Sequence, residues 1–197
     1  DVVLDLTVAS MGLKNARVII ESGKIPVIGT SGFTERDVAE LKELAAKHRV
    51  GGIIVPNFAI GAVLMMRFAE IAAPFCETAE IIEIHHDGKA DSPSGTAIST
   101  AKRMASASNA WAKDPTTHEA IAGARGAKGP ADIRIHAVRM RGAVANQEVV
   151  FGTQGQTLTI RHDTIDRVSF MPGVVMACKK IAEHPGLTLG LDALLGI

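Results

Sequence analysis

Three apolar runs near the start of the sequence constrain the fold more than any other feature. They are VVLDL at residues 2–6, IPVIGT at 25–30 and VGGIIVP at 50–56. Their apolar residues are nearly consecutive, whereas a strand with one face in water alternates apolar and polar residues. Runs of this kind are buried on both faces, and they are typical of parallel sheets that helices cover on both sides.

Segments with helical spacing separate these runs and follow the last one. They lie at residues 11–23, 35–48 and 59–75. Thr34 precedes the second segment and Asp37 stands three residues later, which predicts a capping box at the start of that helix. Because each strand is followed by a helix, the first part of the chain is predicted to be an α/β domain with a parallel sheet.

The three predicted strands end in small or hydrogen-bonding residues. These ends lie at residues 5–7, 29–32 and 55–58. Ligands of open parallel sheets bind beyond the carboxyl ends of the strands. The sequence therefore predicts a ligand crevice at this edge of the sheet.

The middle of the chain has a different pattern. Four segments alternate more clearly, at residues 79–86, 131–140, 146–153 and 156–163. The last three follow one another with little helix between them, which predicts a second sheet that is partly antiparallel and has one more open face. Helical spacing returns at residues 174–184, and we expect the tail to pack back onto the first domain.

Composition excludes several classes of function. Lys plus Arg equals Asp plus Glu at 21 each and aromatic residues make up 4%, so neither nucleic acid nor an anionic membrane is an expected partner. No apolar run approaches the roughly 18 residues that span a bilayer, and we expect a soluble, cytoplasmic protein. Cys76 and Cys178 form no C-x-x-C pair and are predicted to be reduced core thiols.

The stretch EIHHDGKADSPSGTA, residues 83–97, concentrates groups that carry chemistry. Successive side chains of a strand point to opposite faces, so His85 and His86 diverge and no metal site is expected. One interpretation is structural: both histidines end a strand and bond carbonyl groups, and Lys89 is solvated.

The residues after the histidines favour a functional interpretation. The turn DSPSGT leads into a helix, so the amides of residues 95–97 lie near a helix N-terminus, where an anion is stabilised. Gly95 leaves room for close approach, Lys89 adds a positive charge, and a histidine can deliver a proton near neutral pH. Together these groups predict a small carboxylate substrate that is protonated during the reaction.

The same stretch resembles the E-x-H-H-x-x-K-x-D-x-P-S-G-T-A signature of the dihydrodipicolinate reductase (4-hydroxy-tetrahydrodipicolinate reductase) family. VVLDLT is similar to the family's V-x-x-D-F-T with Leu6 for Phe, VIGTSGF to V-I-G-T-T-G-F with Ser31 for Thr, and VPNFAIG to A-P-N-F-S-x-G. Later segments, including IRIHAVRMRG and LTIRHDTIDRVSFMPGV, follow in the family's order. The resemblance covers essentially the whole chain.

The resemblance implies an enzyme of lysine and diaminopimelate biosynthesis that reduces 4-hydroxy-tetrahydrodipicolinate to tetrahydrodipicolinate with NADH or NADPH. It implies an α/β fold: the C-terminal part of a Rossmann-type parallel-sheet domain, at residues 1–57 and 168–197, and an α+β substrate-binding and tetramerisation domain with a mixed sheet, at 58–167. The family's Gly-rich cofactor fingerprint lies upstream of its V-x-x-D-F-T segment, so we expect this sequence to lack it. A homotetramer built through the second sheet is also implied.

The family's residue roles carry over where the motifs match. His85 is implied to be the proton donor and acceptor, and Lys89 a second proton donor and carboxylate partner. The residues implied to hold the substrate are His86, Gly95, Thr96 and Ser31. The residues implied to line the cofactor are Gly29, Thr30, Ser31, Val55, Pro56, Asn57 and Phe58, together with Arg167, where the family's returning tail nears the cofactor.

Two other interpretations remain open at this point. The chain could be a non-catalytic dicarboxylate-binding or oligomerisation module that dispenses with the cofactor half. A Rossmann oxidoreductase of the amino-acid dehydrogenase type has less support, because such enzymes do not carry the His-His-x-x-Lys stretch.

Overall fold

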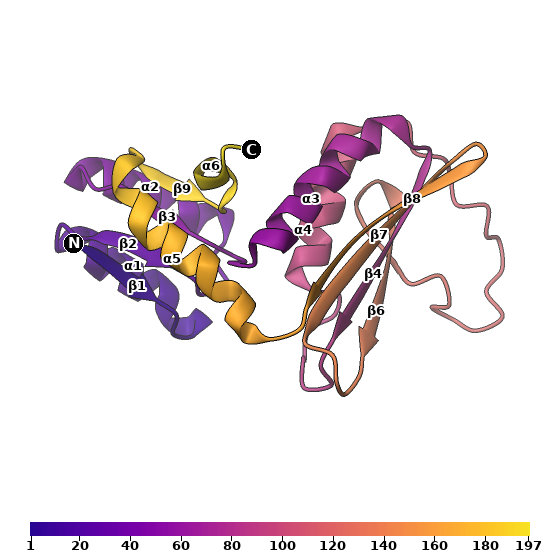
Figure 1. Ribbon diagram of the computed structural model, residues 1–197, viewed down its shortest axis with the longest axis horizontal. Helices are drawn as coiled ribbons and strands as arrows, with labels where there is room; N and C mark the ends of the chain where they lie inside the picture. Colours follow the sequence, from indigo (N-terminus) through magenta and orange to yellow (C-terminus); the bar gives the residue numbers. More distant parts are fainter. The chain divides into compact units, whose positions relative to one another are not determined.

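The computed structural model describes residues 1–197. The chain forms two compact units, one made of residues 1–63 and 170–197 and the other of residues 64–169. Both termini belong to the first unit (Figure 1). The helix α3 (Ile60–Ala72) contains the boundary between the two units in the sequence.

A four-stranded parallel sheet organises the first unit, as the apolar runs predicted. Its strand order is β1-β2-β3-β9, and every neighbouring pair is parallel. The strands are β1 (Val2–Asp5), β2 (Ile25–Ile28), β3 (Gly52–Ile54) and β9 (Leu187–Leu189). Strand β9 has no counterpart among the predicted strands, because three residues are too few to show a period.

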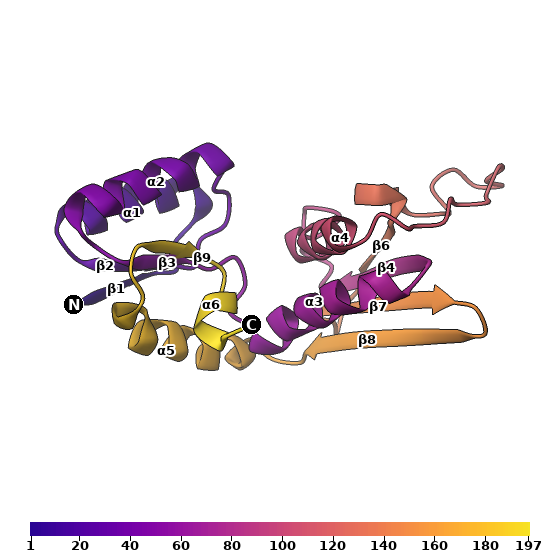
Figure 2. The same ribbon diagram turned by 90° about the horizontal axis from the view of Figure 1, so that it is seen from above.

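Helices cover both faces of this sheet. Helices α1 and α2 lie on one face, and α5 and α6 lie on the other (Figure 2). Their bounds are α1 (Ala9–Glu21), α2 (Glu35–His48), α5 (Met171–Lys180) and α6 (Asp192–Leu195). The capping box is confirmed, since the Thr34 side chain accepts from the Asp37 amide and the Asp37 carboxylate accepts from the Thr34 amide.

One apolar cluster joins α1 and α2 to the sheet. Ile20, Leu41 and Ala45 of the helices are fully buried against Ile28 and Ile54 of the strands. The odd-numbered neighbours in the strands face the other way and are buried as well, which explains why these runs do not alternate.

The second unit contains a five-stranded mixed sheet of order β5-β6-β4-β7-β8. Strands β4 and β6 are parallel, and the other pairs are antiparallel. The strands are β4 (Thr78–His85), β5 (Ala127–Lys128), β6 (Arg134–Arg139), β7 (Ala145–Thr153) and β8 (Gln156–Thr164). The predicted second, mixed sheet is confirmed; which of its strands pair in parallel was not predicted.

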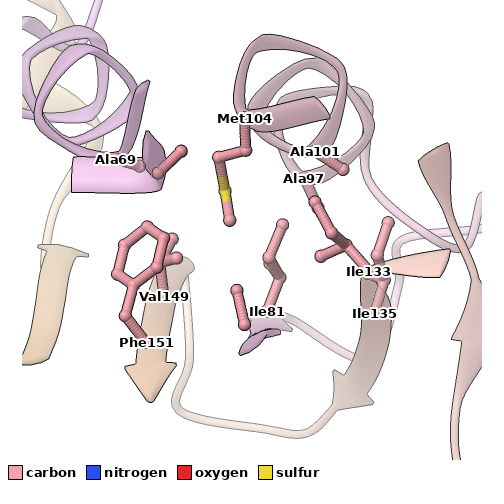
Figure 3. Close-up of a cluster of buried hydrophobic side chains, with 11 residues drawn as sticks. Ala69, Ile81, Ala97, Ala101, Met104, Ile133, Ile135, Val149 and Phe151 are labelled. Atoms are coloured by element: carbon pink, nitrogen blue, oxygen red, sulfur yellow. The ribbon is translucent and has the colours of Figure 1, made fainter. Parts of the chain in front are cut away.

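Helices α3 and α4 (Gly95–Ala107) pack on one face of the mixed sheet (Figure 1). The core lies between them and the strands, where Met104 of α4 points into the space beside Ile81 and Phe151 (Figure 3). All three side chains have no exposed area. This packing fixes which face of β4 is buried, and so fixes the direction of every later side chain on that strand.

Several element ends differ from the predicted ones. Helix α3 stops at Ala72 and continues as a 3-10 turn (Ala73–Phe75), because Pro74 lacks the amide hydrogen that an α-helix needs. Helix α5 ends at Lys180 before a 3-10 turn (Ile181–Glu183). The remaining 3-10 turns are Pro130–Asp132 and Arg167–Phe170.

None of the helices has the length and apolar character needed to cross a lipid bilayer. Cys76 and Cys178 are both free thiols and are half-buried. Burial raises the pKa of each thiol.

Candidate active site

Strand β4 places Glu83 and His85 on its helix-facing side. Ile81, two residues before Glu83, lies in the core under α3 and α4. Because side chains alternate along a strand, Glu83 and His85 share that face. Glu83 is completely buried, and the His85 side chain is 15% exposed. The face that is apolar along most of β4 thus becomes polar at its carboxyl end.

The buried Glu83 carboxylate has four hydrogen-bond donors around it. One oxygen, Oε1, accepts from the Ser94 amide at 3.0 Å and from Arg139 Nη2 at 2.9 Å. The other, Oε2, accepts from Arg139 Nη1 at 2.8 Å and lies 2.5 Å from His85 Nδ1. A buried carboxylate is costly unless it is paired and bonded in this way.

These contacts set the charges of the two side chains. Burial by itself would raise the pKa of Glu83, but the hydrogen bonds from Arg139, His85 and Ser94 outweigh it and lower that pKa. Burial lowers the pKa of His85; Glu83 opposes this effect, whereas the cations of Lys89 and Arg139 add to it. At neutral pH the carboxylate is therefore ionised and the imidazole is neutral.

An ionised Glu83 also decides which ring nitrogen of His85 carries the proton. A carboxylate without a proton can only accept, so the short contact requires a proton on Nδ1. The second nitrogen, Nε2, is left to exchange a proton with a ligand. This is the arrangement expected of a side chain that moves a proton.

The segment after β4 brings positive charge to the same end of the strand. The Lys89 ammonium bonds the Asp91 carboxylate at 2.7 Å, and its side chain is 20% exposed. Arg139 Nη2 donates to the Asp91 carbonyl at 2.7 Å, which ties this segment to β6. His86 packs against Gly88, where an added Cβ would come within 3.3 Å of its Nδ1, so the two histidines have different neighbours.

Helix α4 begins at Gly95, directly after this segment. Ser94 is its N-cap, and its hydroxyl accepts from the Ala97 amide at 3.2 Å. The Ala97 amide, expected to be part of an anion site, is therefore used by the cap. A Cβ added at Gly95 would meet nothing within 4 Å, so the backbone at the helix start is open on that side. The dipole of α4 makes this end attractive to a negative charge.

In the first unit, residues predicted to line the cofactor gather at the carboxyl ends of β2 and β3. Gly29 is closely packed, since a Cβ there would lie 2.5 Å from the Leu6 side chain and 2.6 Å from Phe58. Asn57 Oδ1 accepts from the Ala59 amide at 2.9 Å. Thr30 Oγ1 is buried and has no hydrogen-bond partner within the chain.

A cavity of about 410 Å³ opens beside these strand ends. Residues of its lining that belong to the predicted set are Thr30, Ser31 and Pro56. Apolar side chains line most of the remainder, among them Phe33, Val38 and Leu189. Its lining suits an uncharged planar group better than a phosphate.

The predicted site residues thus divide between the two units. His85, His86, Lys89, Gly95 and Thr96 follow one another around the end of β4. The cofactor-side residues belong to the first unit, with the exception of the exposed Arg167, which lies in a 3-10 turn of the second. No group of three or more His, Cys, Asp or Glu side chains in residues 1–197 could hold a metal ion.

Sequence reasoning missed three residues of this site. Glu83 could have been found, because it stands two residues before His85 and so shares its face. Ser94 could have been found too, because it lies in the same stretch of residues 83–97. Arg139 has no such signal, since its contact with Glu83 joins positions 56 apart in the sequence. Asp5, at the end of β1, belongs to the strand ends that the sequence indicated; it is buried and accepts from Asn15 Nδ2 at 2.9 Å.

Comparison with known proteins identifies the family. The profile described as "Dihydrodipicolinate reductase, N-terminus" matches residues 1–58, and "Dihydrodipicolinate reductase, C-terminus" matches residues 61–195. The chain belongs to the dihydrodipicolinate reductase family. The 4-hydroxy-tetrahydrodipicolinate reductase of Mycobacterium sp. (strain KMS) is 49% identical over 100% of this chain and 81% of its own length.

Other members of the dihydrodipicolinate reductase family give the same picture. The 4-hydroxy-tetrahydrodipicolinate reductase of Moorella thermoacetica is 50% identical over 99% of this chain and 73% of its own length. Among solved structures, the dipicolinate-bound dihydrodipicolinate reductase of Paenisporosarcina sp. TG-14 aligns with a TM-score of 0.86 at 43% identity, covering 98% of this chain and 73% of that one. The recognition made from the motifs is confirmed.

Proposed function

We propose that this protein catalyses the reduction of 4-hydroxy-tetrahydrodipicolinate to tetrahydrodipicolinate, a step of lysine and diaminopimelate biosynthesis. The observation that carries the proposal is the relationship to 4-hydroxy-tetrahydrodipicolinate reductases, which extends over 99–100% of the chain at 49–50% sequence identity. The reaction consumes one reduced nicotinamide cofactor and one proton, and it releases water. The chain must therefore bind a dicarboxylate, deliver a proton and hold the cofactor.

The groups around the end of β4 suit a dicarboxylate. Lys89 precedes the start of α4 in the sequence, and at that start Gly95 leaves the backbone open. A full positive charge and a helix N-terminus both stabilise a carboxylate. On binding, the Lys89 ammonium exchanges its exposed partner Asp91 for a substrate carboxylate, and Thr96 and His86 complete the binding site. The Paenisporosarcina relative, which is bound to dipicolinate, supports this class of ligand.

His85 is the proposed proton donor. In the free protein its ring is neutral with the proton on Nδ1, so Nε2 has no proton to give. The two carboxylates of the substrate add negative charge near the ring, and negative charge raises the pKa of a histidine. His85 then takes up a proton at Nε2, and the Glu83 carboxylate stabilises the resulting cation from the other side. The ring carbon next to the site of reduction receives this proton.

The cofactor is held by the strand ends of the first unit. The largely apolar cavity beside these strand ends fits the flat ring of a nicotinamide. The residues proposed to contact the ring are Gly29, Thr30, Ser31 and residues 55–58, and Arg167 is proposed to contact the cofactor as well. When bound, the reduced nicotinamide supplies the hydride. The proposed cofactor is NADH or NADPH.

The alternative of a non-catalytic dicarboxylate-binding module is not favoured. Such a module would have no need for a buried carboxylate that fixes the proton position on His85. The relatives that this chain matches over 73–81% of their own length are named as reductases.

The test is a reductase assay of the protein expressed from its complete gene. Freshly prepared 4-hydroxy-tetrahydrodipicolinate should cause consumption of NADH or NADPH, measured by the absorbance of the reduced nicotinamide. Omitting the substrate should abolish this consumption. A well-folded protein that binds dipicolinate in calorimetry but consumes neither cofactor would contradict the proposal and favour the binding module.

We also propose a cytoplasmic homotetramer built through the mixed sheet. The face of this sheet opposite the helices carries Ile82, Ile84 and Val138 on two neighbouring strands, with His136 and Glu148 beside Ile82. Apolar side chains grouped in this way are costly to leave in water, and a partner subunit would cover them. Light scattering of the complete protein should give four times the protomer mass; a monomer would contradict the assembly.

A further inference from the structure

Packing alone does not require a carboxylate at position 83. Two neighbouring residues on the same face of the sheet, Ile81 and Val149, are apolar and fully buried, the partner of Glu83 on β7 is the uncharged Gln147, and an uncharged side chain could fill the position. Instead a charged group is held there with no exposed surface, and it needs four donors to compensate it. A buried ion pair contributes little net stability compared with apolar residues of similar volume. The charge of Glu83 is therefore better explained by its contact with His85 than by its effect on stability.

We propose that Glu83 and Arg139 are positioning residues for His85: the Arg139 guanidinium fixes the Glu83 carboxylate through two parallel hydrogen bonds, and that carboxylate fixes the His85 ring with its proton on Nδ1. The proposal rests on the proposed function for its kinetic consequences. The position of the proton and the orientation of the ring follow from the contacts alone.

Arg139 is itself held in place from three directions. Its two terminal nitrogens reach both oxygens of Glu83, at 2.8 and 2.9 Å. The same nitrogens donate to the Val138 carbonyl at 2.8 Å and to the Asp91 carbonyl at 2.7 Å. A planar guanidinium with this many fixed contacts cannot rotate, so the carboxylate in its fork cannot rotate either.

The geometry of the sheet explains why the arginine reaches the carboxylate. In the parallel pair of β4 and β6, Arg139 is the register partner of His85, and Ala137 is the partner of Glu83. Arg139 therefore lies on the helix-facing side with both of them. Ala137 is small, so the long arginine side chain can lie back along the strand toward Glu83.

The charges that face His85 have opposite effects on its proton affinity. Glu83 on its own strand favours the protonated ring. Arg139 on β6 and Lys89 in the following segment disfavour it, and Asp91 is paired with Lys89. The first turn of α4 contributes no acidic residue, and the partner of His85 on β7 is an alanine. Removing Glu83 and removing Arg139 should therefore change the titration of His85 in opposite directions.

Three substitutions separate positioning from a merely structural role. Glu83→Gln keeps the shape of the side chain and an oxygen that accepts from the Ser94 amide, but it removes the negative charge. Arg139→Gln removes the positive charge that disfavours protonation of His85. Arg139→Lys keeps a positive charge but cannot form the two parallel hydrogen bonds to Glu83. Arg17→Gln is the matched control, because Arg17 makes a similar two-bond pair with Glu40, at 2.6 and 2.8 Å, between α1 and α2.

The first readout is the pH profile of kcat. If protonated His85 is the acid, activity falls as pH rises through its pKa in the complex. This fall should move to lower pH in Glu83→Gln and to higher pH in Arg139→Gln, while Arg139→Lys and Arg17→Gln keep the wild-type position. We also expect kcat to decrease about 10- to 100-fold in Glu83→Gln, because a wrong proton position costs part of the roughly 10² to 10⁴ that a general acid supplies.

The second readout needs neither substrate nor cofactor. Nitrogen NMR of 15N-histidine-labelled protein above neutral pH distinguishes the two neutral forms of an imidazole, and the His85 signal is assigned by its loss in His85→Gln. We expect the Nδ1-protonated form in the wild type, and a mixture of both forms in Glu83→Gln. A wild-type ring protonated on Nε2 would overturn the proposal, even if the enzyme proved to be a reductase.

The two readouts also separate this inference from the proposed function. Absence of reductase activity in the wild type with an Nδ1-protonated ring would refute the function and leave the positioning role standing. An active wild type whose Glu83→Gln and Arg139→Gln variants keep its pH profile would refute the positioning role. If Glu83→Gln fails to fold, the shift of the pH profile of kcat in Arg139→Gln tests the positioning role by itself.

Discussion

Replacing His85 with alanine should slow catalysis strongly while leaving the fold in place. The ring occupies the end of β4, has a small exposed fraction of 15%, and touches the one charged group that is completely buried, Glu83. In the His85→Ala variant, Glu83 keeps its two bonds from Arg139 and the one from the Ser94 amide. The buried charge therefore remains compensated, and the main loss is a single charged hydrogen bond.

That loss sets the expected change in stability. A hydrogen bond to a charged group contributes about 1.5–3 kcal/mol. For a chain of this length, each kcal/mol corresponds to roughly 2–4 °C in Tm, so Tm should fall by about 3–12 °C. The effect on turnover is separate, since a missing general acid lowers kcat by about 10² to 10⁴. This corresponds to about 2.7–5.5 kcal/mol in the activation free energy.

The assay combines steady-state kinetics with thermal unfolding of the same samples. We expect the fall in kcat with a much smaller change in KM, and NADH affinity in calorimetry close to that of the wild type. His86→Ala is the control, because the neighbouring ring is proposed to bind substrate and should mainly raise KM. Wild-type kcat in His85→Ala would refute the role of the ring. A collapse of Tm with near-normal turnover below it would show that the ring serves structure alone.

Three further predictions concern the surrounding charges and the core. Lys89→Ala should lower kcat and also raise KM in the same assay, because the ammonium contacts a substrate carboxylate; an unchanged KM would exclude that contact. Phe151→Ala should lower the free energy of unfolding by about 3–5 kcal/mol in urea titration, since Phe151 is fully buried, whereas Ile165→Ala at an exposed position should change it little. Hydrogen bonds from Thr116, and then the cations of Arg125 and Arg134, hold the pKa of Asp114 far below its usual 3.8. The unfolded chain therefore binds a proton there before the folded chain does, so this stabilisation is present above pH 3.8 and is lost as pH falls below it. Asp114→Asn should consequently lose less stability than the wild type on acidification, and equal losses in both proteins would contradict the assignment.

The order of strands and helices in the first unit could be predicted from the sequence because it depends on local patterns. Consecutive apolar residues in 25–30 and 50–56 reflect burial on both faces, and Val27 and Ile28 are indeed both fully buried. The capping box at Thr34 could also be predicted, since its two hydrogen bonds join residues only three apart in the sequence. The chemistry of residues 83–97 was found for the same reason: its histidine, lysine and glycine are contiguous.

The working arrangement of His85 depended on the tertiary structure. Nothing in the pattern of residues 134–139 says that this strand pairs in parallel with β4, and only that pairing places Arg139 beside His85. The fourth parallel strand, β9, was hidden in the same way, because its partner β3 lies more than a hundred residues earlier in the chain. Periodicity records which face of a segment is buried, but strand order and register depend on how all segments pack together. The sequence by itself therefore determined the folding units and the reactive groups, and the tertiary structure decided which charge orients which ring.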